Sequence, residues 1–148
     1  MRAAYITDLE TWSSEFSFSV AVSVRFSETD MYGHLNNTVP FAYFEYARIE
    51  YLKHIGFMGN WLDPSGANIP VVADLQCDYL QQVYFDEALD IYVKAAKIGN
   101  SSIDIHYMAK NEKGEIAFTG RGSMVQIGRK SGKGVPWTEA ERLLLQTK

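Results

Sequence analysis

The sequence predicts an α+β domain in which a five-stranded antiparallel sheet wraps around one long central helix. Five segments alternate apolar and polar residues, as half-buried strands do, and residues 38 to 56 carry an apolar stripe at helical spacing. Short turns separate the last four strands, which favours an antiparallel meander. A helix and a sheet bury each other's apolar faces if the sheet curves around the helix.

The first predicted strand, residues 16 to 26, leads through a polar junction into the helix. The strand alternates phenylalanine and valine with serine, alanine and arginine. The helix begins near Asn37 or Thr38, because Pro40 fits only its first turn, and Gly56 suits its end. Its apolar face comprises Phe41, Phe44, Ala47, Tyr51 and Ile55, widened by Ala42, Ile49 and Leu52.

The rest of the chain completes the sheet. After a turn-rich loop at residues 57 to 68, alternation returns in four strands near residues 71–79, 89–95, 103–109 and 116–127. One face of the first of these four is predicted to carry Val71, Ala73, Leu75, Cys77 and Tyr79. A loop at residues 128–137 precedes a short helix at residues 138–147, with Thr138 as N-cap and Glu141 completing a capping box.

No linker or repeat divides the 148 residues, so we expect a single domain spanning residues 1–148, with residues 1–14 as an N-terminal extension. The outer face or edge of such a sheet needs covering, which predicts a homo-oligomer.

Composition excludes several classes of function. Fourteen lysines and arginines stand against 18 aspartates and glutamates, a net charge of −4 that argues against nonspecific nucleic-acid binding. The single cysteine, Cys77, permits no intrachain disulfide and fits a reducing compartment. The N-terminal residues lack the apolar stretch of a signal peptide, and no apolar run reaches membrane-spanning length. We therefore expect a cytoplasmic protein with neither a membrane nor a nucleic acid as partner.

Nucleophile and metal motifs are also lacking. There is no G-x-S-x-G elbow, and Cys77 lies within an alternating strand, where a small buried residue is expected. Residues 128–134, GRKSGKG, depart from the Walker spacing by one residue. The three histidines are scattered singly, so no metal site is predicted. We expect His54 to interact with a helix C-terminus and His106 to face solvent.

The remaining constellation is the junction ETDMYGHLNN, residues 28 to 37. Backbone N–H groups at the start of the following helix can polarise a carbonyl and stabilise an oxyanion. Asp30 can then attack that carbonyl or activate water. An alternative also fits, in which Asp30 caps a turn, Gly33 supplies a positive φ, and Asn36 and Asn37 cap the helix. The residues alone leave both interpretations open.

The stretch VRFSETDMYGHLNNTVPFAYFEYARIEYLKHIGF, residues 24 to 57, resembles the signature of hotdog-fold acyl-CoA thioesterases of the 4-hydroxybenzoyl-CoA thioesterase type. The motif in those enzymes is R-F/Y-x-D/E-x-D, then G-H-x-N-N, then Y/F-x-E-x-A-R. The matching positions are Arg25, Phe26, Glu28, Asp30, Gly33, His34, Asn36, Asn37, Phe44, Glu45, Ala47 and Arg48. The order of elements agrees over nearly the whole chain. The resemblance implies the hotdog fold and hydrolysis of an acyl- or aroyl-CoA to a free acid and coenzyme A.

The same resemblance implies roles for individual residues. Asp30 matches the catalytic carboxylate, backbone N–H groups around Asn37 and the first helical turn would form the oxyanion hole, and His34 would support catalysis by orienting Asp30 or by holding the loop. The substrate would be the only coenzyme involved, and the oligomer would be a homodimer or a dimer of dimers. The residues expected to contact substrate are Tyr32, Gly33, Asn36, Pro40 and Phe41. Apart from the resemblance, Arg129 and Lys130 form a basic cluster with Lys133 that can meet coenzyme A phosphates, and a charged exposed loop is the favoured alternative.

Two positions depart from the related pattern. Tyr32 stands where acyl-carrier-protein thioesterases have Asn, and Pro40 replaces an aromatic residue. Some hotdog thioesterases use a carboxylate on the helix, a role that Glu45 could fill; the favoured interpretation is that Glu45 pairs with Arg48 on the helix surface. Asp74 and Asp78 are expected to face solvent or a subunit contact. A hotdog-fold enoyl-CoA hydratase or dehydratase and a noncatalytic acyl-CoA-binding module are the alternative functions.

Overall fold

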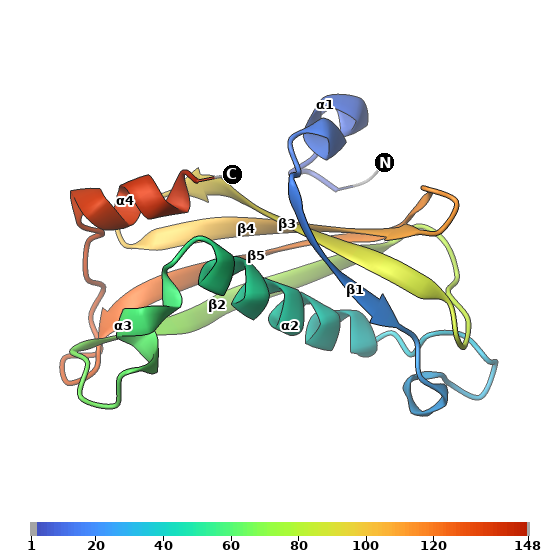
Figure 1. The fold of residues 1–148 in the computed structure, drawn as a ribbon, viewed down its shortest axis with the longest axis horizontal. Coiled ribbons are helices and arrows are strands. Elements are labelled where there is room, and N and C mark those ends of the chain that lie inside the picture. The colour runs from blue at the N-terminus through green and yellow to red at the C-terminus, as the bar shows by residue number, and fades with distance from the viewer. Residues whose placement is uncertain (1–2, 148) are drawn as a thin grey trace.

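One antiparallel sheet and one long helix organise the chain, seen here in a computed structural model that describes residues 3–147, apart from the side chain of Asn60. The strands lie in the order β1-β3-β4-β5-β2 (Figure 1). Their bounds are β1 Phe18–Ser23, β2 Asn68–Tyr79, β3 Ala88–Ile98, β4 Ser102–Asn111 and β5 Ile116–Gly128. This confirms the predicted α+β fold with five antiparallel strands. The first two and the last residue of the predicted domain lie outside the described residues.

The predicted four-strand meander is wrong for β2. This strand pairs with β5 at the sheet edge, and β3 pairs with β1 and β4. Residues 80–87 are long enough to cross the end of the sheet between β2 and β3. Val83 anchors this crossing segment: its side chain is buried, and its carbonyl accepts a hydrogen bond from Leu35 N at 2.6 Å. This link therefore lies against the junction that precedes the helix.

A β-bulge in β2 also changes which residues share a face. The register shifts between Val72 and Asp74, so Ala73 is the extra residue. Val72 and Leu75 pair with Met124 and Gly122, which are two residues apart on β5, and so face the same side. The prediction that Val71 shares a face with Leu75 is wrong, because the bulge reverses the alternation.

The central helix α2, Val39–His54, covers the inner face of the sheet. Thr38 is its N-cap, Pro40 lies in its first turn, and Gly56 follows its end with φ +82°. The ring of Phe44 stacks on Tyr107 of β4, with centroids 4.4 Å apart. A Cβ at Gly120 would lie 2.4 Å from Cε2 of Phe44, so only glycine permits this approach.

The buried face of α2 is rotated from the predicted one. Ala42 and Ile49 are exposed, whereas Tyr43 and Arg48 are buried. The expected Glu45–Arg48 pair is absent from the ion pairs of the described residues, because Arg48 points toward the sheet and Glu45 is exposed. Nη1 of Arg48 donates to the Tyr107 hydroxyl at 3.1 Å instead, and Nε has no partner in the described part of the chain.

Two short helices follow α2. The segment predicted as a loop contains a short helix, α3, Met58–Leu62. Phe57 and Trp61 pack against Trp137, so this helix has a buried apolar face. The C-terminal helix α4, Glu139–Leu145, has the predicted capping box: Glu141 N donates to Thr138 Oγ1 at 3.1 Å, and Thr138 N donates to Glu141 Oε1 at 2.9 Å.

The N-terminal extension covers the outer face of the sheet. It contains α1, Leu9–Ser14, which lies on the opposite side of the sheet from α2 (Figure 1). A second apolar cluster forms there from Ala3, Ile6, Trp12, Phe16 and Met108. His106 lies beneath it and is only 6% exposed, so the prediction that His106 faces solvent is wrong. No amphipathic pattern in residues 1–14 was strong enough to predict this cover.

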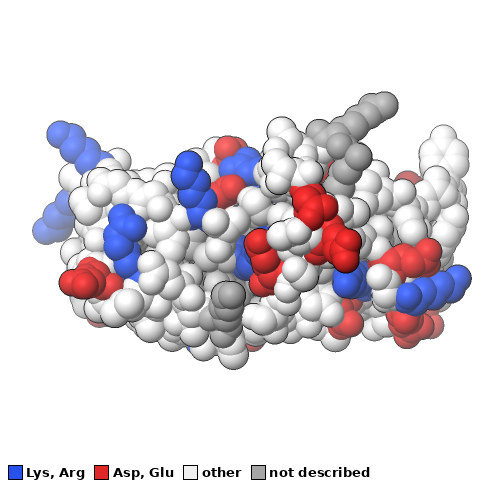
Figure 2. All heavy atoms as spheres, turned by 90° about the horizontal axis from the view of Figure 1, so that it is seen from above, with Lys and Arg blue, Asp and Glu red and all other residues white. Residues whose placement is uncertain are grey.

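On the face seen from above, acidic and basic side chains are interspersed (Figure 2). Within the described residues, no helix is long and apolar enough to cross a membrane.

Candidate active site

A small hairpin carries the candidate catalytic residues to the N-terminus of α2. A 3₁₀ turn, Phe26–Glu28, leads into it, and Thr29 and Leu35 form an isolated antiparallel bridge. Asp30 N donates to His34 O at 2.8 Å. Gly33 closes the turn with φ +81°, a conformation that favours glycine. The positive φ predicted for Gly33 is confirmed.

The Asp30 carboxylate has one oxygen held and one available. Oδ1 accepts hydrogen bonds from Tyr32 N at 2.9 Å and His34 N at 3.2 Å. Oδ2 accepts no hydrogen bond from any described residue. Asp30 thus caps its own turn, as the alternative interpretation predicted, and also presents a free, oriented oxygen.

The start of α2 offers a matching donor. The side chain of Asn36 accepts hydrogen bonds from the backbone N–H and the hydroxyl of Thr38, both at 3.1 Å. Because Thr38 is the N-cap, these bonds close a turn just before the helix, and the prediction that Asn36 caps the helix is wrong. The Asn37 N–H has no acceptor among the described residues, and the hydroxyl of Tyr79 donates to the Asn37 carbonyl. An unpaired N–H at a helix N-terminus is a suitable donor to an anion.

Asp30, His34 and Asn37 line the same cavity, of about 290 Å³. The other lining residues come from the start of the hairpin's return strand, the end of β2, the crossing segment and β5. They are Leu35, Tyr79, Leu80, Gln81, Gln82, Val83 and Phe118. These residues were not predicted from the sequence, because the segment after β2 was interpreted as a simple turn. The loss of alternation at Leu80, Gln81 and Gln82 was the available signal.

His34 and Tyr32 occupy different environments. The His34 ring packs edge-on against Tyr84, with centroids 5.1 Å apart, and makes no side-chain hydrogen bond with Asp30 in the described part of the chain. Tyr32 is 76% exposed and stacks beside His34 at 6.4 Å. The ring of His34 is therefore placed to support the hairpin rather than to orient the Asp30 carboxylate.

Four other predicted contact residues lie away from this cavity. Pro40 is buried in the first turn of α2, and Phe41 packs edge-on against Phe44. Arg129 and Lys130 line a separate hollow of about 590 Å³ with residues 64–68, beyond the far end of β2. Within a single chain, the structure does not bring these basic side chains to Asp30.

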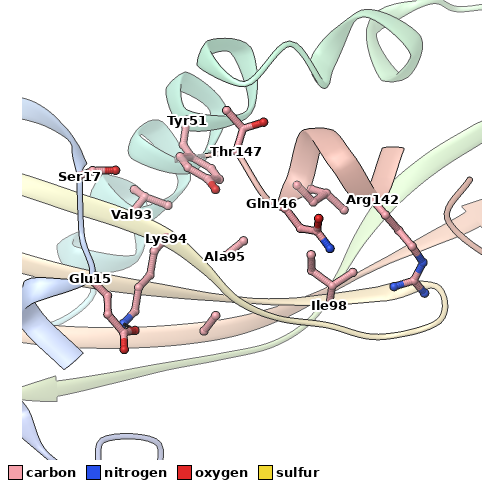
Figure 3. A pocket seen from close by; sticks show the side chains of 12 residues that line it. Glu15, Ser17, Tyr51, Val93, Lys94, Ala95, Ile98, Arg142, Gln146 and Thr147 are labelled. Carbon is pink, nitrogen blue, oxygen red and sulfur yellow. Dashed lines mark hydrogen bonds and ion pairs between the residues drawn. The ribbon is translucent and has the colours of Figure 1, made fainter. Parts of the chain in front are cut away.

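A third hollow, of about 460 Å³, lies between β3, α4, Tyr51 of α2 and the segment that carries Glu15 and Ser17 (Figure 3). Its charged side chains make structural bonds: Lys94 Nζ lies 2.6 Å from Glu15 Oε2 and 2.9 Å from Trp12 O, and Arg142 donates to Gly99 O at 2.8 Å. Asp30, His34 and Asn37 are not among the residues that line this hollow.

Other reactive groups are unsuited to catalysis. Cys77 is half-buried against the core, and burial raises the pKa of its thiol to about 12, so it is a poor nucleophile. The described residues contain no cluster of three or more side chains suited to bind a metal.

A sheet wrapped around one helix, with a carboxylate-bearing hairpin at the helix N-terminus, is the hotdog fold as acyl-CoA thioesterases use it. A family model of the thioesterase-like superfamily matches residues 24–143, and the chain belongs to that superfamily.

One curated protein and two solved structures illustrate the similarity. The chain is 48% identical to the uncharacterized protein YsmA of Bacillus subtilis (strain 168), over 98% of this chain and 97% of YsmA. Among solved structures, it is similar to a thioesterase from Thermus thermophilus complexed with coenzyme A and Zn. The identity is 32%, the coverage 88% of this chain and 92% of that chain, and the TM-score 0.72. The DHNA-CoA thioesterase of Staphylococcus aureus is 26% identical, with coverage of 80% and 78% and a TM-score of 0.73.

Proposed function

We propose that this protein is an acyl-CoA thioesterase that hydrolyses an acyl- or aroyl-CoA to a free acid and coenzyme A. The observation that carries the proposal is the pairing of two groups in one cavity. Asp30 keeps Oδ2 unbonded while Oδ1 is fixed by two backbone N–H groups, and Asn37 keeps its N–H unbonded at the start of α2, both within the described part of the chain. Membership of the thioesterase-like superfamily supports the same reaction.

In the proposed reaction, the thioester carbonyl oxygen accepts a hydrogen bond from Asn37 N–H. Two routes fit a carboxylate in this position. In one, Asp30 Oδ2 attacks the carbonyl carbon, the C–S bond breaks, and water hydrolyses the resulting anhydride. In the other, Asp30 takes a proton from a water that attacks the same carbon. Both routes consume one water, and the departing sulfur gains a proton. Neither route needs a cofactor besides the substrate.

We further propose that the site is completed in a homodimer through β2. This strand is an edge strand of 12 residues, and Val72, Leu75 and Tyr79 on its inner face are between 38% and 52% exposed. Antiparallel pairing of two β2 strands about a two-fold axis sets the Asn68 end of one strand beside the Tyr79 end of the other.

That pairing would give Arg129 and Lys130 a role. Arg129 N donates to Ala67 O at 2.7 Å, so both basic residues sit at the Asn68 end of β2. Arg129 and Lys130 of the partner subunit would then approach the Asp30 cavity, where they can meet coenzyme A phosphates. Light scattering measures the mass in solution, and a monomer would exclude this part of the proposal. Assembly into a dimer of dimers and a cytoplasmic location remain predictions.

The experiment that tests the function is a panel of acyl-CoA substrates of varied chain length, branching and aromaticity, assayed by release of free thiol. We expect thiol release from at least one member. Conversion of an enoyl-CoA to a hydroxyacyl-CoA without thiol release would identify a hydratase instead. Tight binding without turnover across the panel would identify a noncatalytic binding module.

A further inference from the structure

Glu28 joins the catalytic hairpin to the body of α2. Its Oε1 accepts hydrogen bonds from the Tyr43 hydroxyl and from Arg25 N, both at 2.8 Å. Tyr43 lies on the second turn of α2 and is only 6% exposed, so its hydroxyl is held by packing. The side chain of Glu28 is 13% exposed. A side-chain bond inside the protein therefore connects the hairpin that carries Asp30 to α2, which begins two residues after Asn37.

The backbone of Glu28 contacts the other strand of the hairpin. Its carbonyl accepts a hydrogen bond from Asn36 N at 2.8 Å. Asn36 directly precedes Asn37, whose N–H is the candidate oxyanion donor, and Asp30 lies two residues beyond Glu28. Glu28 is thus bonded to Asn36, next to the candidate oxyanion donor, through its backbone carbonyl, and to Tyr43 of α2 through its carboxylate.

The electrostatics favour a charged acceptor at this position. Burial acts to raise the pKa of Glu28, but hydrogen bonds from Arg25 N and the Tyr43 hydroxyl, with the Arg25 guanidinium 3.5 Å away, bring it below its ordinary value. Burial and the bond to Glu28 raise the pKa of Tyr43, so the tyrosine remains the donor. Hydrogen bonds to an ionised acceptor are stronger than those between neutral groups.

We propose that Glu28 and Tyr43 are positioning residues that set the Asp30 carboxylate and the Asn37 N–H at the separation the reaction requires. The inference rests on the proposed thioesterase function. A displacement of about 1 Å between reacting groups can lower a rate by about a hundredfold, so a bond remote from the substrate can control turnover. A purely structural bond would change stability and leave turnover by the folded enzyme unaltered.

Tyr43→Phe tests the proposal because it removes only the hydroxyl. We expect kcat for the best acyl-CoA to fall about tenfold and KM to stay within about twofold, since alignment is lost while the cavity remains. The assay is run well below the melting temperature of each variant. Tyr46→Phe is the matched control, because Tyr46 lies on the same helix and is 49% exposed. An unchanged kcat in Tyr43→Phe, or an equal loss in Tyr46→Phe, would overturn the inference.

Glu28 variants provide the rescue experiment. Glu28→Gln keeps a carbonyl oxygen that can accept both hydrogen bonds, so we expect it to retain most of kcat. Glu28→Ala removes the acceptor, and we expect the same loss of kcat as in Tyr43→Phe. If both variants lower kcat equally, the acceptor geometry is not what matters and the positioning role is wrong.

A second measurement separates this inference from the proposed function. Hydrogen exchange at Asn36 N–H, which bonds to Glu28 O, should be about tenfold faster in Tyr43→Phe than in wild type if the hairpin loosens. If wild type releases thiol from no acyl-CoA, the proposed function fails. In that case, unchanged hydrogen exchange at Asn36 N–H in Tyr43→Phe would also reject the connection between hairpin and helix. If wild type is active and the variants are unchanged, the positioning inference alone fails.

Discussion

Two sets of polar groups in this protein differ in how fully their hydrogen-bonding capacity is used. On the outer face of the sheet, Trp12 Nε1 donates to His106 Nδ1, His106 Nε2 donates to Asp104, and Arg121 binds the same carboxylate, with distances of 2.6–2.9 Å. At the hairpin, Asp30 Oδ2 and Asn37 N–H have no partner in the described part of the chain. The first set begins where Trp12 of α1 meets His106 of β4, and the residues of the second line an open cavity.

This difference indicates which group is available for chemistry. Buried polar groups that bond one another stabilise one arrangement and have no capacity left for a substrate. A free donor and a free acceptor on residues that line one open cavity are available to bind a reacting group. The contrast predicts that changes at the hairpin lower activity more than stability, and that changes on the outer face do the opposite.

Asp30→Asn should produce the largest effect. The amide keeps the size of the side chain and the oxygen that caps the turn, but it is neither a nucleophile nor a base. We expect kcat/KM to fall about a thousandfold while the free energy of unfolding changes by less than about 1 kcal/mol. Thiol-release kinetics and urea denaturation measure the two quantities. An unchanged rate would remove Asp30 from the mechanism.

Trp12→Ala tests the outer face. Trp12 is 6% exposed and contacts Phe16, His106 and Lys94, so we expect the free energy of unfolding to fall by about 3 kcal/mol. Trp12→Phe keeps much of the volume and loses the N–H, and should cost about 1 kcal/mol. Both variants should keep kcat at temperatures where they are folded. Loss of kcat in folded Trp12→Phe would contradict the separation of the two regions.

His34→Ala should have an intermediate effect. The ring packs against Tyr84 and lines the cavity, but it makes no hydrogen bond to the Asp30 side chain in the described residues. We expect kcat to fall about tenfold through loosening of the hairpin, far less than in Asp30→Asn. Parallel kinetics of the two variants provide the comparison. An equal loss would make His34 a direct participant.

The sequence was most informative where local chemistry decides the structure. The alternation in β1, Pro40 and Gly56 at the ends of α2, and Gly33 in its turn were all predicted. Each depends on backbone preferences of a few neighbouring residues, which act wherever the segment lies in the fold. Asp30, His34 and Asn37 could be grouped for the same reason, because one short hairpin carries them to one cavity.

The failures concern contacts between distant segments. His106 occupies a polar position in its strand, and only the packing of residues 3–16 across the outer face buries it. The pairing of β2 with β5 depends on a crossing segment whose partner is Leu35. Arg48 was expected to pair with Glu45 on the helix surface because the two are three residues apart, yet it bonds Tyr107 beneath the helix. Single-sequence periodicity contains no information about such partners.

The pH dependence of stability gives the smallest effect and tests the outer network directly. Trp12 N–H occupies Nδ1 of His106, so the folded protein holds a neutral ring whose Nε2–H donates to Asp104. Burial lowers the pKa of His106; nearby Lys94 and Arg121 lower it further, and Asp104 opposes them. The ring of Tyr5, 4.9 Å away, completes its surroundings.

The sign follows from proton uptake. In the unfolded chain His106 titrates near its ordinary pKa of 6.5, so below that pH the unfolded state binds more protons than the folded state. The free energy of unfolding should therefore decrease as the pH falls below 6.5, until the lower pKa of the folded state is reached. Urea denaturation between about pH 7 and pH 5 measures the decrease, and His106→Gln should reduce it. His54→Gln should retain it, because His54 stacks on Phe18 outside this network. Equal pH dependence in His106→Gln and wild type would show that another group controls the acid response, and that the outer face is less rigidly satisfied than its hydrogen bonds indicate.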